Sequence, residues 1–146
     1  MKGQVVKSSL KLNEIFVEKV EFKRSENFNK SANNELKFKF ESSINEKDTN
    51  NYKVSIKVNI SSGAAEELVI NVIMCALFGF VFNEKLSNDI IKSMLEKNTL
   101  AIMYPYVRSY ITNLSAQSGI NPIILPTINI SAMIDSQENS YNSIEK

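Results

Sequence analysis

The sequence predicts an α+β fold in which four strands precede two or three helices. Two observations lead to this prediction. Apolar and polar residues alternate in the first half of the chain, whereas apolar residues between 86 and 114 recur every three or four positions. A chain of 146 residues suits one domain. We expect that domain to span residues 1–135 and the polar residues 136–146 to form a flexible tail.

The first predicted strand is the least regular. Its richness in Ile, Val and Phe favours a strand. The spacing of Leu12, Ile15, Phe16 and Val20 also satisfies a helical stripe. The apolar residues at even positions, as a strand requires, are Leu10, Leu12, Phe16, Val20 and Phe22.

The second and third predicted strands alternate clearly, so each has one solvated face. Residues 45–51 between them have the composition of a turn, which predicts an antiparallel hairpin. The apolar residues are Leu36, Phe38, Phe40 and Ile44 in the second strand, and Tyr52, Val54, Ile56, Val58 and Ile60 in the third.

The fourth predicted strand has no polar face. From Leu68 to Met74 its β-branched content favours a strand covered on both sides, in the centre of a sheet or at an interface. Residues 78–82 continue the apolar character past its expected end. Cys75, the single cysteine, lies in this run and is expected to be a small buried hydrophobe.

Two helices are expected next. The first begins near Ser87, and the second begins at Asn98 or Thr99 as its N-cap and ends at Gly119. Pro105 must kink the second helix or start it. Ser131 is expected to cap a short third helix. The stripe of the second helix is Leu100, Met103, Tyr104, Val107, Ile111 and Leu114.

The composition argues against catalysis. The chain has no histidine, which removes the commonest general base and metal ligand, and its four glycines are scattered. We therefore expect no enzymatic activity, no metal and no cofactor. A net charge of +1 predicts neither nucleic-acid nor membrane binding. The polar N-terminus lacks the apolar region of a secretory signal. The longest apolar stretch has 15 residues, too few for a membrane-spanning helix. We therefore expect a cytoplasmic protein without membrane insertion.

One stretch carries a family resemblance. The run Tyr104-Pro105-Tyr106-Val107-Arg108 resembles the Phe-Pro-Tyr-Ala-Arg signature that opens the main helix of the SecB export chaperones. This resemblance implies a four-stranded antiparallel sheet with helices on one side, assembled as a homotetramer that is a dimer of dimers. Further residues matching that family in order are Gly119, Pro122, Leu125, Pro126 and Asn129.

The resemblance also implies a function. SecB proteins are ATP-independent holdases that bind unfolded preproteins in apolar grooves and keep them competent for translocation. Many weak apolar contacts on one assembly give avidity without sequence selectivity. Unfolded polypeptides are therefore the expected clients. The client-binding residues that the resemblance implies are Leu36, Phe38, Phe40, Phe78, Phe80, Phe82, Leu125, Met133 and Ile134.

One departure from the family concerns its partner SecA. SecB proteins dock on SecA through acidic residues of the sheet, and this chain has Lys19, Lys23 and Val72 at the aligned positions. The reversed charge argues against SecA as a partner. Two alternatives stay open: a dedicated chaperone of one partner such as an antitoxin, and a structural module whose apolar residues are consumed by oligomerisation.

Overall fold

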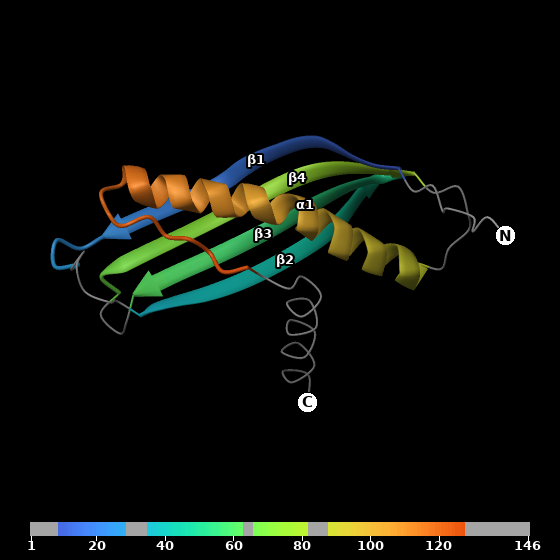
Figure 1. The fold of residues 1–146 in the computed structure, drawn as a ribbon. Helices are drawn as coiled ribbons and strands as arrows, with labels where there is room; N and C mark the ends of the chain where they lie inside the picture. Colours follow the sequence, from blue (N-terminus) through green and yellow to red (C-terminus); the bar gives the residue numbers. More distant parts are fainter. Residues whose placement is uncertain (1–8, 29–34, 63–65, 82–87, 128–146) are drawn as a thin grey trace, which may run out of the picture.

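The computed structural model describes residues 9–28, 35–62, 66–81 and 88–127. These ranges form two layers, a four-stranded antiparallel sheet and one long helix across one of its faces (Figure 1). The predicted α+β class and antiparallel sheet are confirmed. The elements are β1 (Ser9–Arg24), β2 (Leu36–Asp48), β3 (Asn51–Ser62), β4 (Leu68–Val81) and α1 (Asn88–Gln117).

The strand order is β1-β4-β3-β2, and every neighbouring pair is antiparallel. The predicted hairpin is the β2–β3 pair, but its turn is shorter than residues 45–51 because Asp48 already pairs with Asn51. Asn50 in the turn has a φ of 66°, which asparagine tolerates better than most residues. The order places β4, the most apolar strand, in the centre of the sheet.

Two register shifts in β1 explain its ambiguous periodicity. They lie between Leu12 and Glu14 and between Val17 and Lys19. Each inserts an extra residue and moves the alternation by one position. Phe16, which the even-numbered pattern placed with the core, pairs with Cys75 on the opposite face. The apolar residues paired with the helix-facing side of β4 are Leu10, Leu12, Ile15, Val17, Val20 and Phe22.

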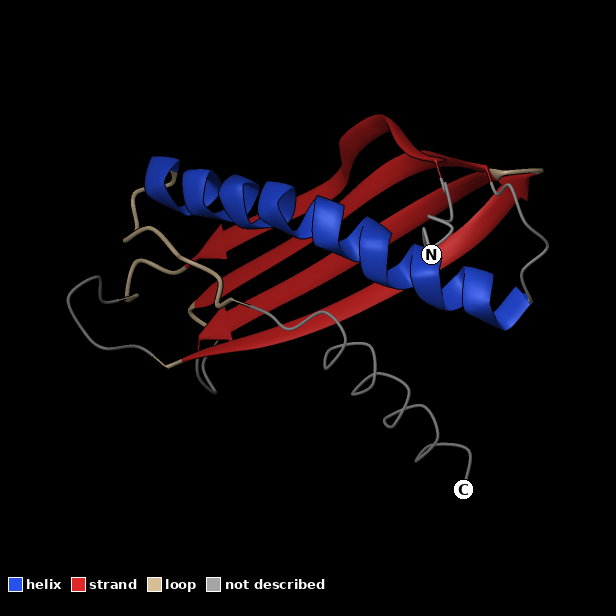
Figure 2. Ribbon diagram, turned by 45° about the vertical axis from the view of Figure 1, so that its right-hand side comes forward, coloured by secondary structure: helices blue, strands red, loops and turns tan. Residues whose placement is uncertain are grey.

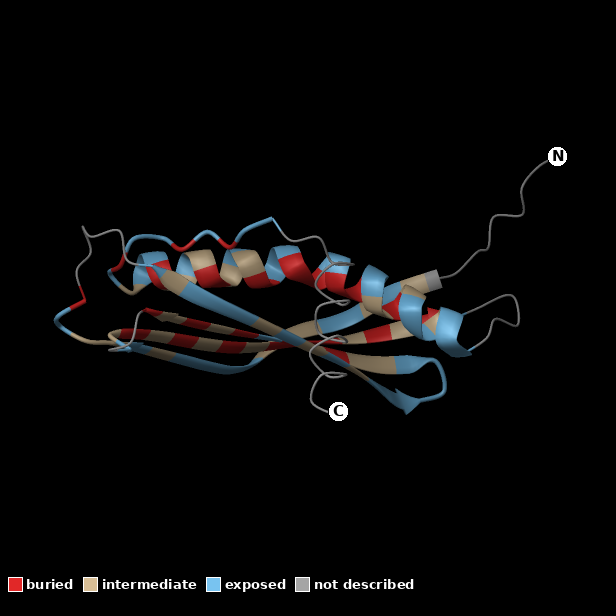
Figure 3. Ribbon diagram, turned by 90° about the horizontal axis from the view of Figure 1, so that it is seen from below, coloured by how far each residue is buried: buried red, intermediate tan, exposed pale blue. Residues whose placement is uncertain are grey.

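The core lies between the sheet and α1, as the edge-on view shows (Figure 3). The helix packs over β3 and β4. Its buried residues recur at spacings of three and four, as one face of a helix requires. From the sheet the core receives Val54, Ile56, Val58 and Ile60 of β3 and Leu68, Ile70, Val72, Met74, Ala76 and Phe78 of β4.

The other face of β4 was expected to be covered too. Within the described ranges α1 covers only one face, and Val69, Ile73 and Leu77 on the other are half-buried. Cys75 is buried on that face, as expected, and its Sγ lies 3.4 Å from the Ser55 Oγ. The strand also runs on to Val81, so Phe78 and Phe80 belong to it.

The prediction of two separate helices before Gly119 is wrong, because α1 is continuous over 30 residues (Figure 2). Thr99, expected as an N-cap, is a fully buried residue inside the helix. Its Oγ1 donates to the Leu95 carbonyl at 2.6 Å, so the hydroxyl is satisfied without ending the helix. The predicted third helix after Ser131 lies outside the described residues.

Pro105 also sits within α1 and does not start it. Proline cannot donate to the carbonyl of Ala101, but both residues are exposed. Water can therefore reach that carbonyl, which reduces the cost of the missing hydrogen bond. The signature around Pro105 consequently lies in the middle of the helix and not at its start.

Gly119 follows the end of α1, as predicted, with a φ of 82°. The Ile120 N–H donates to the Ser115 carbonyl at 3.4 Å, a pattern that closes helices through a left-handed residue. We expect Gly119→Ala to lower the free energy of unfolding by about 1–2 kcal/mol, because alanine is strained in that conformation. Urea denaturation measures this, and Ala116→Gly, within α1, is the comparison. An unchanged stability for Gly119→Ala would contradict the assignment.

Candidate functional site

The three client-binding residues predicted on β2 share the helix-facing side of this edge strand. Leu36 and Phe40 are half-buried, and Phe38 remains 38% exposed. Ile44 continues the series and is half-buried. We call Leu36, Phe38, Phe40 and Ile44 the β2 apolar row. Among the described residues of the predicted site, only those of this row keep exposed or half-buried apolar side chains.

The predicted residues of β4 lie deeper. Phe78 is 0% exposed and Phe80 is 1% exposed, and Leu125 after the helix is also fully buried. A side chain without exposed surface contacts another molecule only if the fold opens. The structure therefore separates these three from the accessible Phe38. The remaining predicted residues, Phe82, Met133 and Ile134, lie outside the described ranges.

Tyr104 connects the β2 apolar row to the helix. The rings of Phe40 and Tyr104 meet edge to face, with centroids 6.4 Å apart and an interplanar angle of 62°. The Tyr104 hydroxyl donates to the Pro126 carbonyl. Burial raises the pKa of the Tyr104 phenol, against the opposing effect of Arg108. The phenol is thus protonated at neutral pH and available as a donor.

Residues 120–127 form an extended segment beside α1, on the same side of the sheet (Figures 1 and 2). Two further helix side chains hold its backbone. The Thr112 Oγ1 donates to the Ile123 carbonyl at 2.8 Å, and the Ile123 N–H donates to the Ser115 Oγ at 2.8 Å. The segment is therefore fixed along the helix, with Leu125 facing the core and Ile124 66% exposed.

Two hollows flank α1. One, of about 490 Å³, lies between the helix and the extended segment, and Tyr104, Arg108 and Ile124 are among its lining residues. The other, of about 340 Å³, lies between the helix and β1, where Ile15, Val17 and Tyr106 contribute. Neither Ile124 nor Tyr106 was among the predicted site residues. Alternation in extended chain offered a signal for Ile124, since Ile123 and Leu125 both face inward.

The residues aligned with the SecA docking positions lie on two different faces. Lys19 and Lys23 are exposed on the face that α1 leaves uncovered. Val72 is 0% exposed and belongs to the core beneath the helix. It cannot contact a partner at the surface, so its alignment with a docking position was wrong. The neighbouring residues Asn71 and Ile73 occupy the uncovered face in its place.

The described residues also bear on metal binding and on membrane spanning. They contain no group of three or more His, Cys, Asp or Glu side chains placed to hold a metal ion. Among them, no helix combines the length and apolar content needed to cross a membrane.

Comparisons with protein families and curated sequences give one consistent result. The family model described as preprotein translocase subunit SecB matches residues 3–140. The protein-export protein SecB of Anaplasma phagocytophilum is 30% identical over 89 residues, which cover 59% of this chain and 56% of that protein. An uncharacterised protein of Methanocaldococcus jannaschii is 28% identical over 132 residues, 88% of this chain and 84% of that protein. The match thus spans little more than half of the Anaplasma protein.

A solved structure shares the fold. It is the Mycobacterium tuberculosis SecB-like chaperone in complex with a peptide from the HigA1 antitoxin. It superposes with a TM-score of 0.66 at 14% identity, covering 82% of this chain and 88% of that one.

Proposed function

This chain belongs to the SecB family, and from that premise we propose that it is an ATP-independent holdase for unfolded polypeptides, including preproteins awaiting translocation. The family membership and the shared fold with a SecB-like chaperone support a chaperone role. The proposal requires no catalytic step and no cofactor.

The observation that carries the proposal is the β2 apolar row. A soluble chain gains free energy by burying large apolar side chains, yet Phe38 stays 38% exposed between the half-buried Leu36 and Phe40. The row runs along an edge strand, so an unfolded segment can lie beside it. Apolar contacts of this kind are non-directional and suit clients without a shared sequence.

A test of this proposal follows the aggregation of a reduced, unfolded client by light scattering. The unaltered chain is expected to suppress aggregation at stoichiometric concentration. Phe38→Ser should raise the concentration needed about fivefold, since it removes a contact worth about 1 kcal/mol. The control is Ser43→Ala, which alters an exposed residue on the opposite face of β2. Absence of suppression by the unaltered chain would refute the holdase assignment.

We also propose assembly into a homotetramer, as a dimer of dimers. Large apolar side chains are exposed on β1 and α1, where Val20 is 44%, Ile102 is 37% and Tyr106 is 50% exposed. Ile102 and Tyr106 are four residues apart and so share one side of the helix. We expect sedimentation equilibrium to give a tetramer, and Ile102→Glu with Tyr106→Glu to give smaller species. A monomeric unaltered chain would contradict this proposal.

A second candidate function is that of a dedicated chaperone for one partner such as an antitoxin. It is favoured by the fold shared with a SecB-like chaperone that carries an antitoxin peptide, and by Lys19 and Lys23 at positions where SecB proteins present acids to SecA. One abundant co-purifying protein would favour this function. A mixture of co-purifying proteins, together with capture of SecA in a pull-down, would favour the general holdase. A purely structural module predicts an assembly that binds no apolar dye.

A further inference from the structure

The face of the sheet that α1 leaves uncovered carries an uneven distribution of charge. Residues on this face align across the four strands in rows, given by the strand registers. The first row is Lys37, Ser61, Val69 and Lys23; the second is Lys39, Asn59, Asn71 and Glu21; the third is Glu41, Lys57, Ile73 and Lys19. These three rows lie where β2 and β4 begin.

Five exposed lysines therefore gather in one half of this face. We call Lys19, Lys23, Lys37, Lys39 and Lys57 the basic patch. The two acids in the same rows are Glu21 and Glu41, so the rows carry a net charge of +3. Lys39 pairs with Glu41 at 3.2 Å, and the other four form no ion pair with another described residue. Glu35 and Glu67 lie just outside, before β2 and β4 begin.

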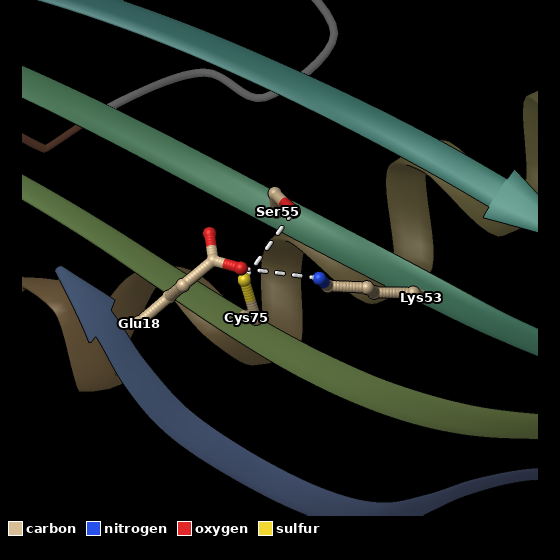
Figure 4. Close-up of polar contacts among 4 residues, drawn as sticks. All are labelled: Glu18, Lys53, Ser55 and Cys75. Carbon is tan, nitrogen blue, oxygen red and sulfur yellow. Dashed lines mark hydrogen bonds and ion pairs between the residues drawn. The ribbon is translucent and has the colours of Figure 1, made fainter.

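In the opposite half of the face, acidic residues accompany the lysines, and one ion pair crosses the sheet (Figure 4). Glu18, at the second register shift of β1, reaches across β4 to Lys53 of β3 at 3.3 Å. Asp48 accepts a hydrogen bond from Asn51 at 2.5 Å at the turn. Lys11 shares this half with Glu14, and Lys47, at the register shift of β2, adjoins Asp48. The basic patch is thus a local feature and not a property of the whole sheet.

The spacing of the basic patch fits an extended polypeptide. Strands lie about 4.8 Å apart, so Lys57 and Lys19, on either side of β4, are separated by about 10 Å, close to the Debye length at physiological salt. Along each strand the rows repeat about every 7 Å, the distance between alternate side chains of an extended peptide. Val69 and Ile73, both half-buried, form an apolar floor between the lysines.

We infer that the basic patch is a docking surface for an acidic polypeptide segment that carries apolar residues between its carboxylates. The lysines supply the charge complementarity, and Val69 and Ile73 supply contacts for aliphatic side chains. The three rows of the patch contain no aromatic side chain, and Phe16, on the same face beyond the third row, is half-buried. A surface without a row of exposed aromatic rings for base stacking favours polypeptide over single-stranded nucleic acid. This surface lies on the opposite side of the sheet from the β2 apolar row and acts independently of it.

The test measures fluorescence anisotropy of a short fluorescein-labelled peptide in which glutamates alternate with serine and valine. We expect the full chain to bind it, and binding to weaken between about 50 and 300 mM salt. The variant Lys19→Glu with Lys57→Glu should bind about tenfold more weakly. Lys11→Glu with Lys97→Glu, which changes the net charge equally but outside the patch, should stay within about twofold.

Three results would overturn the inference. The first is equal affinity for a peptide in which lysines replace the glutamates, and the second is an equal loss of affinity in the control variant. The third is tighter binding of a single-stranded oligonucleotide or of an anionic phosphatidylserine vesicle. Failure here is separable from failure of the holdase function. The patch variant is expected to suppress client aggregation normally, and Phe38→Ser to bind the acidic peptide normally.

Discussion

Phe78→Ala is expected to lower the free energy of unfolding by about 3–5 kcal/mol, the usual cost of removing a buried phenylalanine. Phe78 is 0% exposed in the central strand and pairs with Leu12 of β1 and Tyr52 of β3. Truncation there leaves a cavity that the paired strands cannot close without losing their own hydrogen bonds. Urea denaturation at fixed protein concentration measures the change, because assembly links stability to concentration.

The matched variant is Phe38→Ala, at a phenylalanine on the same side of the sheet but 38% exposed on the edge strand. It should cost less than about 1 kcal/mol. The two variants therefore separate the core from the accessible site. If Phe78→Ala left the free energy of unfolding unchanged but abolished client binding, Phe78 would be a binding residue. Its assignment to the core, made from its burial, would then be wrong.

Much of the sheet was predictable because its signals are local. Strict alternation in residues 36–44 and 52–60 indicated one solvated face, and each strand has one. The apolar run from Leu68 placed β4 in the centre of the sheet. The end of α1 at Gly119 was predictable too, because glycine adopts a left-handed conformation at little cost.

Features that depend on non-local contacts were not predictable. The bulges of β1 produce apolar spacings of two and three residues, which imitate a helical stripe in the sequence. Thr99 fits an N-cap and an interior position equally well, and only the packing beneath it keeps the helix continuous. For the site, alternation placed Phe38 and Phe40 on one face. It could not show that Phe78 is sealed beneath α1 while Phe38 stays accessible.

The largest polar contribution is expected from Ser115, where Ser115→Ala should lower the free energy of unfolding by about 1–3 kcal/mol. Ser115 is fully buried and its Oγ has two roles. It donates to the Ile111 carbonyl at 2.9 Å and accepts the Ile123 N–H at 2.8 Å. Alanine leaves that N–H buried without its partner, and this desolvation cost exceeds the net value of an ordinary hydrogen bond.

Ser118→Ala is the control, since Ser118 is half-buried and its Oγ donates only within the helix end, to the Leu114 carbonyl at 2.6 Å. Its loss should stay within about 0.5 kcal/mol. Ser115→Ala should also raise the amide hydrogen exchange of Ile123 and its neighbours, because that segment loses one of the three helix side chains that hold it. A Ser115 variant as stable as the Ser118 variant, with unchanged exchange at Ile123, would show that core packing of Ile123 and Leu125 alone fixes the segment.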